Sequence, residues 1–240
     1  MNRIRLTFTL GLILVVGMVM LFYNDFEKKN VNFLRPEPKN IYFDLGANNG
    51  DSVDNFLDPN IKSHGGNIRS KIPADKLSQK WTIYAIEGNS AFDQNLLDLK
   101  TRYGNTQHEI ILYNGTIVTS YDGFITFYID KNNRYGNHVG SSILENHPDV
   151  VLSKKVSVNK PCIDLARLLR LYTQNDFIVV KMDIEGAEFE LLIHLIKENV
   201  LSLIDVLIVE YHRNLLPFKT PYDLYSAIFK RFNIKEEVWN

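Results

Sequence analysis

The sequence predicts an α/β fold, a Rossmann-like layered domain with a mostly parallel sheet, preceded by an N-terminal transmembrane helix. Three observations support this. An apolar strand runs into a glycine turn and a helix over Ile41–Ser52, short apolar strands then alternate with amphipathic helices, and an uncharged apolar run covers Leu6–Tyr23. Alternation of strand and helix is typical of parallel sheets whose strands are joined by helices.

The composition excludes several classes of protein. The 240 residues include 27 basic and 28 acidic ones, for a net charge of -1, so no overall field favours a nucleic acid, and we expect no such partner. The single cysteine, Cys162, rules out an intrachain disulfide. We divide the chain into a short tail (1–5), a membrane anchor (6–23), a stem (24–39) and one globular domain (40–240).

The apolar run Leu6–Tyr23 is long enough to cross a bilayer. As a helix it would span about 27 Å. A cleaved signal peptide is the alternative, but the run is long for one and ends without small residues. We therefore predict a single-pass signal anchor. Basic residues flank it on both sides and do not set its orientation. By analogy, an N-terminal anchor with a trailing domain favours a type II protein with the domain in the ER or Golgi lumen.

The turn after the first strand predicts a nucleoside site. Gly46 and Gly50 allow a sharp turn and close approach of a ligand, and Asp44 ahead of them can accept hydrogen bonds or face a cation. The Gly-x-x-x-Gly spacing differs from the G-x-G-x-x-G dinucleotide fingerprint. It suits the cationic S-adenosylmethionine better than a diphosphate, although such spacing also serves plain helix–sheet packing. The predicted cofactor-binding residues here are Asp44, Gly46, Ala47, Asn48 and Gly50.

The next segments continue the strand and helix alternation. The first helix covers Asp51–Leu57, and residues 60–80 show no periodicity, which predicts a solvated basic insertion or, alternatively, a loop that contacts an anionic acceptor. The following predicted elements are a strand at 81–86, a helix at 92–103 and a strand at 108–114. Glu87, at the end of the second strand, can accept both hydroxyls of an adenosine ribose in a nicotinamide or an S-adenosylmethionine site.

The second half repeats this pattern after an excursion. A β segment at 123–130 precedes an irregular, polar stretch at 131–155, in which His138 and His147 are too poorly spaced to predict a metal site and are expected to be solvated. The later predicted elements are a strand at 156–158, a helix from Asp164 to Leu171, a buried apolar strand at 177–182, a helix beyond it, a buried strand at 206–209 and a helix at 220–232.

Acidic residues and a histidine follow several of these strands. The carboxyl ends of parallel strands meet at one edge of a sheet, so we expect Asp44, Glu87, Asp183, Glu185, Glu210 and His212 to gather there. For Glu188 we favour a helix-capping role. Asn89 and Asn114 complete the predicted cofactor residues. Asn114 also begins a glycosylation sequon, Asn114-Gly115-Thr116, and we expect it to stay unmodified because the adenine would lie there.

At this point the chain resembles a known family. IYFDLGANNGDS, VVKMDIEGAEFELL, the Tyr121-Asp122-Gly123 turn, Ser141-Ser142, Asp164 and VEYH together resemble the FkbM family of S-adenosylmethionine-dependent methyltransferases, over about residues 40–232. The resemblance implies a class I methyltransferase fold, with seven strands in its complete form, and O-methylation of a hydroxyl on a sugar, glycan or small molecule. The insertion at 60–80 departs from the family pattern, and we expect the terminal antiparallel strands to be short or absent.

A methyl donor of this kind is already activated, so the protein must mainly align the reactants and take a proton from the acceptor. Asp183, Glu185 and His212 are the predicted catalytic residues. We predict no metal site, although Asp183 or Glu185 could hold acceptor hydroxyls or a divalent ion instead. Two alternatives remain. One is a nicotinamide-dependent nucleotide-sugar oxidoreductase or epimerase, which would need the missing dinucleotide fingerprint, and the other is a non-catalytic Rossmann-like binding domain.

Overall fold

The computed structural model of the chain describes residues 37–61, 67–131, 138–212, 215, 228–231 and 234–238. The predicted tail, the anchor and most of the stem lie outside these residues. Within the described part of the chain, no helix has the length and apolar character that a bilayer crossing requires.

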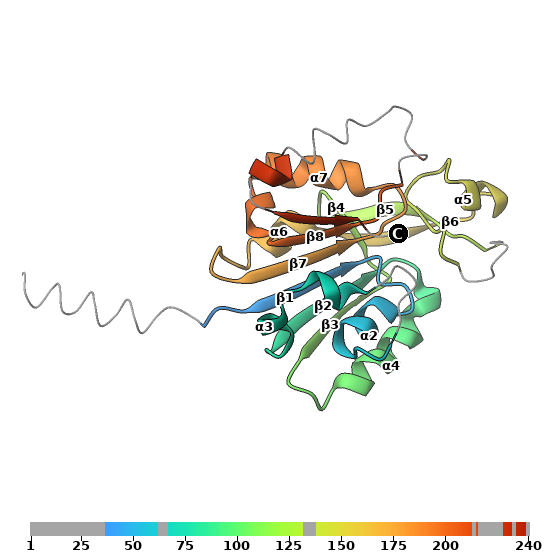
Figure 1. The fold of residues 1–240 in the computed structure, drawn as a ribbon. Coiled ribbons are helices and arrows are strands. Elements are labelled where there is room, and N and C mark those ends of the chain that lie inside the picture. The colour runs from blue at the N-terminus through green and yellow to red at the C-terminus, as the bar shows by residue number, and fades with distance from the viewer. Residues whose placement is uncertain are drawn as a thin grey trace, which may run out of the picture. The chain divides into compact units, whose positions relative to one another are not determined.

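A sheet of six parallel strands forms the centre of the fold (Figure 1). Its strands are β1 (Asn40–Leu45), β2 (Trp81–Glu87), β3 (Glu109–Asn114), β7 (Phe177–Met182), β8 (Val206–Val209) and β9 (Lys235–Val238). The spatial order is β3-β2-β1-β7-β8-β9. The chain order reverses between β1 and β7, and in open α/β sheets ligands bind beyond the carboxyl ends of the strands at such a point. The mostly parallel α/β prediction is thereby confirmed.

Helices cover both faces of this sheet (Figure 1). On one face, α2 and α4 pack Phe56, Leu96 and Leu99 against strand residues such as Tyr42 and Ile83. On the other face, α6 and α7 supply the apolar side chains. The helices are α2 (Asp51–Leu57), α3 (Ala74–Leu77), α4 (Asp93–Tyr103), α5 (Pro148–Leu152), α6 (Leu165–Leu169) and α7 (Glu188–Lys197), with 3₁₀ turns η1 (Ile68–Lys71), η2 (Ser90–Phe92) and η3 (Leu201–Leu203).

A second sheet of three strands extends the domain. Its strands are β4 (Ile117–Thr119), β5 (Gly123–Tyr128) and β6 (Ser157–Asp164), in the order β4-β6-β5. A Cβ atom at Gly88 would lie 2.0 Å from Cδ1 of Ile117. Glycine therefore lets the small sheet approach the carboxyl end of β2 closely.

Two segments expected to be irregular contain ordered structure. The predicted solvated insertion at 60–80 carries η1 and α3 and buries Ile68 and Ile72, because these side chains join the core around Trp81 and Phe56. The stretch at 131–155 contains α5.

Two further strands differ from the prediction. Strand β6 is longer than expected, because it pairs along most of its length with β5. Strand β9 was not predicted, and it pairs parallel to β8. Among the described residues the main sheet has six strands and no antiparallel pair, in line with the expectation that the terminal antiparallel strands are short or absent. Of the predicted last helix, residues 228–231 are described and are helical.

Candidate active site

A cavity of about 700 Å³ lies at the carboxyl ends of β1, β2 and β7, at the reversal of strand order. Of the predicted site residues, Gly46, Asn48, Glu87, Asp183 and Glu185 line it. Further lining side chains are Asp51, Ala91, Phe92, Thr116, Ile117, Phe127, His138, Ser141, Lys181 and Glu210. The cavity thus combines a glycine loop, an apolar flank from the second sheet and a carboxylate-rich edge.

Gly46 brings the loops after β1 and β7 together. Its φ is +75°, and a Cβ atom there would lie 1.9 Å from the carbonyl oxygen of Asp183. An L-residue would therefore meet both backbone strain and a clash with main chain. Because of this close approach, the loop after β1 and the loop after β7 lie side by side and form one continuous wall of the cavity.

Three other residues of the turn lie behind the cavity wall. Gly50 has φ +86° and packs against Leu99, so it serves helix packing. Ala47 is fully buried in the core beside α2. Asp44 is also fully buried, and its carboxylate accepts a hydrogen bond from the Ser52 hydroxyl. None of these three predicted cofactor-binding residues is among those that line the cavity, so any part they play in binding is through the shape of the turn.

Lys181 occupies the centre of this wall. Its ammonium lies 3.4 Å from Asp44 and 3.3 Å from Asp183, and it donates a 2.9 Å hydrogen bond to the carbonyl of Gly46. Burial alone would favour the neutral amine, but the charges of Asp183 and Asp44 raise the pKa of Lys181 above its usual range. The strand expected to be wholly apolar therefore contains a buried charge that links β1 to β7.

Glu87 closes the opposite side of the cavity. Its carboxylate accepts hydrogen bonds from the backbone N–H groups of Asn48 (2.8 Å) and Asn89 (2.6 Å), and only 8% of the residue is exposed. Burial raises the pKa of Glu87 to about 7, against the opposing effect of these two hydrogen bonds. Because Glu87 lines the cavity, its carboxylate can also accept hydrogen bonds from hydroxyl groups of a ligand.

Two of the three asparagines predicted to bind cofactor, Asn89 and Asn114, lie outside the lining. The Asn89 side chain donates to the Ser141 hydroxyl at 3.0 Å and accepts from the Ala91 backbone, so it braces the wall. Asn114 pairs with Glu87 in the β2–β3 ladder, and its side-chain amide points toward the Asp93 carbonyl. Thr116, two residues later, reaches the cavity instead, because Gly115 turns the chain with φ +61°.

The turn between β7 and α7 is held by two side chains, Ser142 from the stretch at 131–155 and Glu188 from the start of α7. Glu185 has φ +54°, and its carbonyl accepts a 2.7 Å hydrogen bond from the Ser142 hydroxyl. The fully buried Glu188 folds back to accept the N–H groups of Ile184 (3.0 Å) and Gly186 (3.1 Å). These bonds cap the turn before α7 and hold the unusual conformation of Glu185 in place.

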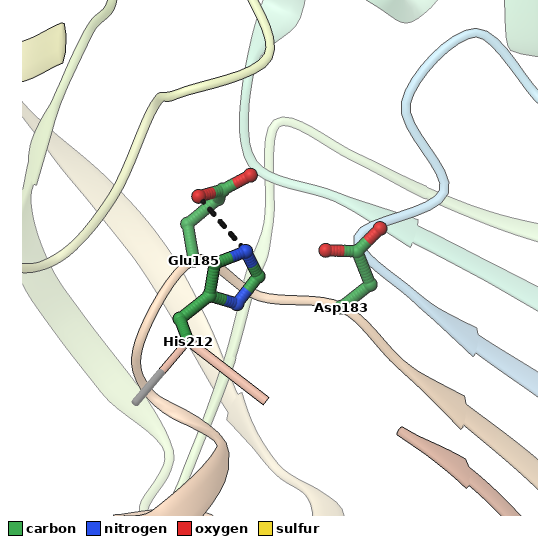
Figure 2. A group of neighbouring side chains, drawn as sticks. All are labelled: Asp183, Glu185 and His212. Carbon is green, nitrogen blue, oxygen red and sulfur yellow. Dashed lines mark ion pairs between the residues drawn. The ribbon is translucent and has the colours of Figure 1, made fainter. Parts of the chain in front are cut away.

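Asp183, Glu185 and His212 come together beyond the ends of β7 and β8 (Figure 2). Asp183 and Glu185 line the cavity, and His212 lies next to Glu185 without lining it. One donor atom from each side chain lies within 4.8 Å of the others. His212 Nε2 is 3.3 Å from the Glu185 carboxylate, and its Nδ1 is 2.9 Å from Glu188. Burial would lower the pKa of His212, but the hydrogen bond to Glu188 and the charge of Glu185 raise it to about 9.

His147 is a further member of this group. It is 5% exposed, and its Nε2 lies 2.9 Å from Glu185. Its Nδ1 accepts the backbone N–H of Asp149, so the neutral ring carries its proton on Nε2 and donates it to Glu185. The prediction of a solvated loop histidine was therefore wrong for His147, because α5 begins there and turns the ring inward.

The edge carries an excess of negative charge. Glu210 also faces the cavity, and burial together with the charge of Asp183 raises its pKa to about 7. The sequence analysis assigned no role in the site to Lys181, Ser142 or His147. A lysine inside a buried strand and a His-Pro pair at a helix start were the signals that could have found Lys181 and His147. Contacts between distant segments, such as Ser142 with Glu185, leave no trace in sequence spacing.

Comparison with known proteins gives one family. The methyltransferase FkbM domain matches residues 44–232. No curated protein and no solved structure matches the chain. The matched range contains every residue of the cavity described above.

Replacing Lys181 tests its role in the wall. We expect Lys181→Met to lower the free energy of unfolding by about 3–5 kcal/mol, because Asp44 and Asp183 lose their buried counter-charge. Adding Asp44→Asn should restore part of the loss. Lys71→Met, which breaks a more exposed pair with Glu237, should cost about 1 kcal/mol or less. Urea unfolding measures all three, and a double variant no more stable than Lys181→Met would contradict the assignment.

The raised pKa of Glu87 predicts how stability depends on pH. A carboxyl whose pKa is higher in the folded protein favours folding fully below its unfolded pKa and loses that contribution as pH rises through about 7. Between pH 4.5 and 8, we expect the free energy of unfolding of the wild type to fall by about 2–3 kcal/mol more than that of Glu87→Gln. Parallel curves for the two proteins in urea unfolding at several pH values would disprove this.

Proposed function

The chain belongs to the FkbM methyltransferase family, and we propose that it transfers a methyl group from S-adenosylmethionine to a hydroxyl oxygen of a sugar, glycan or other small molecule. One observation carries the proposal. One cavity joins a glycine loop and the buried acid that ends β2 to a carboxylate-rich edge after β7. The first half suits a nucleoside, and the second suits a polar acceptor.

The residues present fit S-adenosylmethionine. The volume of about 700 Å³ lies within the range of small-molecule sites. Glu87 would accept the ribose hydroxyls, Phe92 and Ile117 would contact the adenine, and the backbone of Gly46 and Asn48 would lie along the rest of the ligand. The excess of carboxylates suits a ligand that carries ammonium and sulfonium charges.

The chain's own residues would orient the acceptor and take its proton. S-adenosylmethionine, when bound, supplies an activated methyl group whose transfer forms a C–O bond as the C–S bond breaks. Asp183 and Glu185 offer carboxylates that can hold or deprotonate a hydroxyl. His212 donates Nδ1–H to Glu188, so Nε2 is the ring atom that lies beside Glu185, on the acceptor side of the proposed site.

Calorimetry with S-adenosylhomocysteine and, separately, NADH tests the cofactor. We expect the full chain to bind S-adenosylhomocysteine and not NADH. Glu87→Ala should weaken that binding by about 1.5–3 kcal/mol, through loss of charge-assisted hydrogen bonds to the ribose. Glu145→Ala, which removes an exposed carboxylate that pairs with Lys155, is the matched control and should leave the affinity unchanged.

Three outcomes would count against the proposal. Binding of NADH alone would favour an oxidoreductase or epimerase. Failure to bind either ligand would favour a non-catalytic domain. Unchanged affinity in a folded Glu87→Ala protein would remove Glu87 from the cofactor site.

We also propose that residues 6–23 anchor the enzyme in a membrane, with residues 40–240 in the lumen. The proposal rests on the uncharged apolar run in the sequence. We expect the full chain to stay with membranes through an alkaline carbonate wash and to be released by detergent, and a variant without residues 1–26 to be released freely. Digestion of the domain by protease added to sealed vesicles would contradict the lumenal orientation, and release of the full chain by carbonate would contradict the anchor.

A further inference from the structure

The group of Asp183, Glu185 and His212 has the donor set of a metal site. We propose that these three side chains bind a divalent cation, for which Mn²⁺ is the best match. Their donor atoms lie within 4.8 Å of one another, and ligands about 2.1 Å from one ion lie about 3–4 Å apart, so small side-chain rotations would suffice. Two carboxylates suit Mg²⁺ or Mn²⁺, and the imidazole shifts the preference toward the transition metal.

The orientation of His212 is an independent observation. Its Nδ1 is 2.9 Å from the carboxylate of Glu188, which is fully buried and held by two backbone N–H groups. The neutral ring therefore carries its proton on Nδ1 and presents the Nε2 lone pair to Asp183 and Glu185. A histidine ligand typically donates its other N–H to a carboxylate in this way. The capping of α7 alone would not require a histidine here.

The charges of the site also favour a cation. Asp183, Glu185, Glu188 and Glu210 surround His212, while the nearby Lys181 ammonium is shared between Asp44 and Asp183. One buried oxygen of Glu188, Oε2, meets no hydrogen-bond donor among the described residues. Several carboxylates with few counter-charges are costly away from bulk water. A divalent ion would balance them, whereas a protonated His212 balances only one.

The cation would define the acceptor, and this step rests on the proposed methyl transfer. Three protein ligands leave positions open on the ion for oxygen atoms of the substrate. Two hydroxyls on neighbouring carbons could occupy them together, so we infer an acceptor with a vicinal diol, as in a sugar. The ion lowers the pKa of the bound hydroxyl, its proton passes to water, and the oxygen takes the methyl group as the C–S bond breaks and the sulfur becomes a neutral thioether.

Direct metal binding tests the site without any assay of activity. The full chain, freed of metal with a chelator, is titrated with Mn²⁺ while electron paramagnetic resonance reports the free ion. We expect one Mn²⁺ per chain and a rise in melting temperature on binding. Asp183→Asn and His212→Gln should lose most of the binding, and Glu188→Gln should weaken it about 10–100-fold.

The matched control is His194→Gln. His194 also pairs with a carboxylate, Asp164, and its side chain is 16% exposed against 15% for His212. We expect Mn²⁺ to bind this variant as it binds the wild type. Circular dichroism verifies that each variant is folded. If a variant does not fold, the rise in the melting temperature of the wild type with Mn²⁺ is the second test of the site.

Absence of saturable Mn²⁺ binding to the wild type would overturn the proposal, as would equal affinity in all variants. S-adenosylhomocysteine binding, measured on the same preparations, separates the two proposals. Cofactor binding without Mn²⁺ binding would reject the metal site alone, and Mn²⁺ binding without cofactor binding would reject the methyltransferase assignment alone.

Discussion

The buried ammonium of Lys181 is the interaction on which the rest of the site depends. It lies between Asp44 on β1 and Asp183 after β7, and it also donates to the Gly46 carbonyl. An ammonium in this position is tolerated only because carboxylates face it on both sides. The same contacts hold together the two loops that bound the cavity. These contacts of Lys181 hold Gly46 against the Asp183 carbonyl. They also fix the position of Asp183 in the lining of the cavity.

A second set of contacts holds the turn between β7 and α7, which carries Asp183 and Glu185. Ser142 and His147 come from the excursion between β5 and β6, and they bind the carbonyl and the carboxylate of Glu185. Glu188 binds the turn from the helix that follows. Glu185 keeps a backbone conformation that non-glycine residues rarely adopt, because its neighbours leave it little freedom. The edge of the cavity is therefore set by parts of the chain that are about 40 residues apart.

Local patterns predicted most of the fold and the residues that meet beyond the ends of the central strands. The strands at 40–45, 177–182 and 206–209 and the helix at 51–57 follow from apolar periodicity, and the grouping of Asp183, Glu185 and His212 follows from parallel topology. The predictions fell short where contacts between distant parts of the chain determine the surroundings of a side chain. Asp44 was predicted to bind the cofactor, and the structure places it beside Lys181, because alternation along a strand does not say which side chain a distant lysine will meet. His147 was expected in solvent, because its partner Glu185 is 38 residues away.

The excursion between β5 and β6 is closed at its base. The Ile129 N–H bonds to the Val156 carbonyl, and Tyr128 pairs with Ser142 across a bridge. Both ends of the segment thus leave the small sheet at one place, so a replacement segment, or cassette, would have to join the sheet at the same two positions. Such a graft would have to supply a hydroxyl and an imidazole that reach Glu185. A cassette chosen only for its fit to a new acceptor would leave the turn at Glu185 unsupported. Engineering of the substrate range must therefore design acceptor recognition and the support of this turn together.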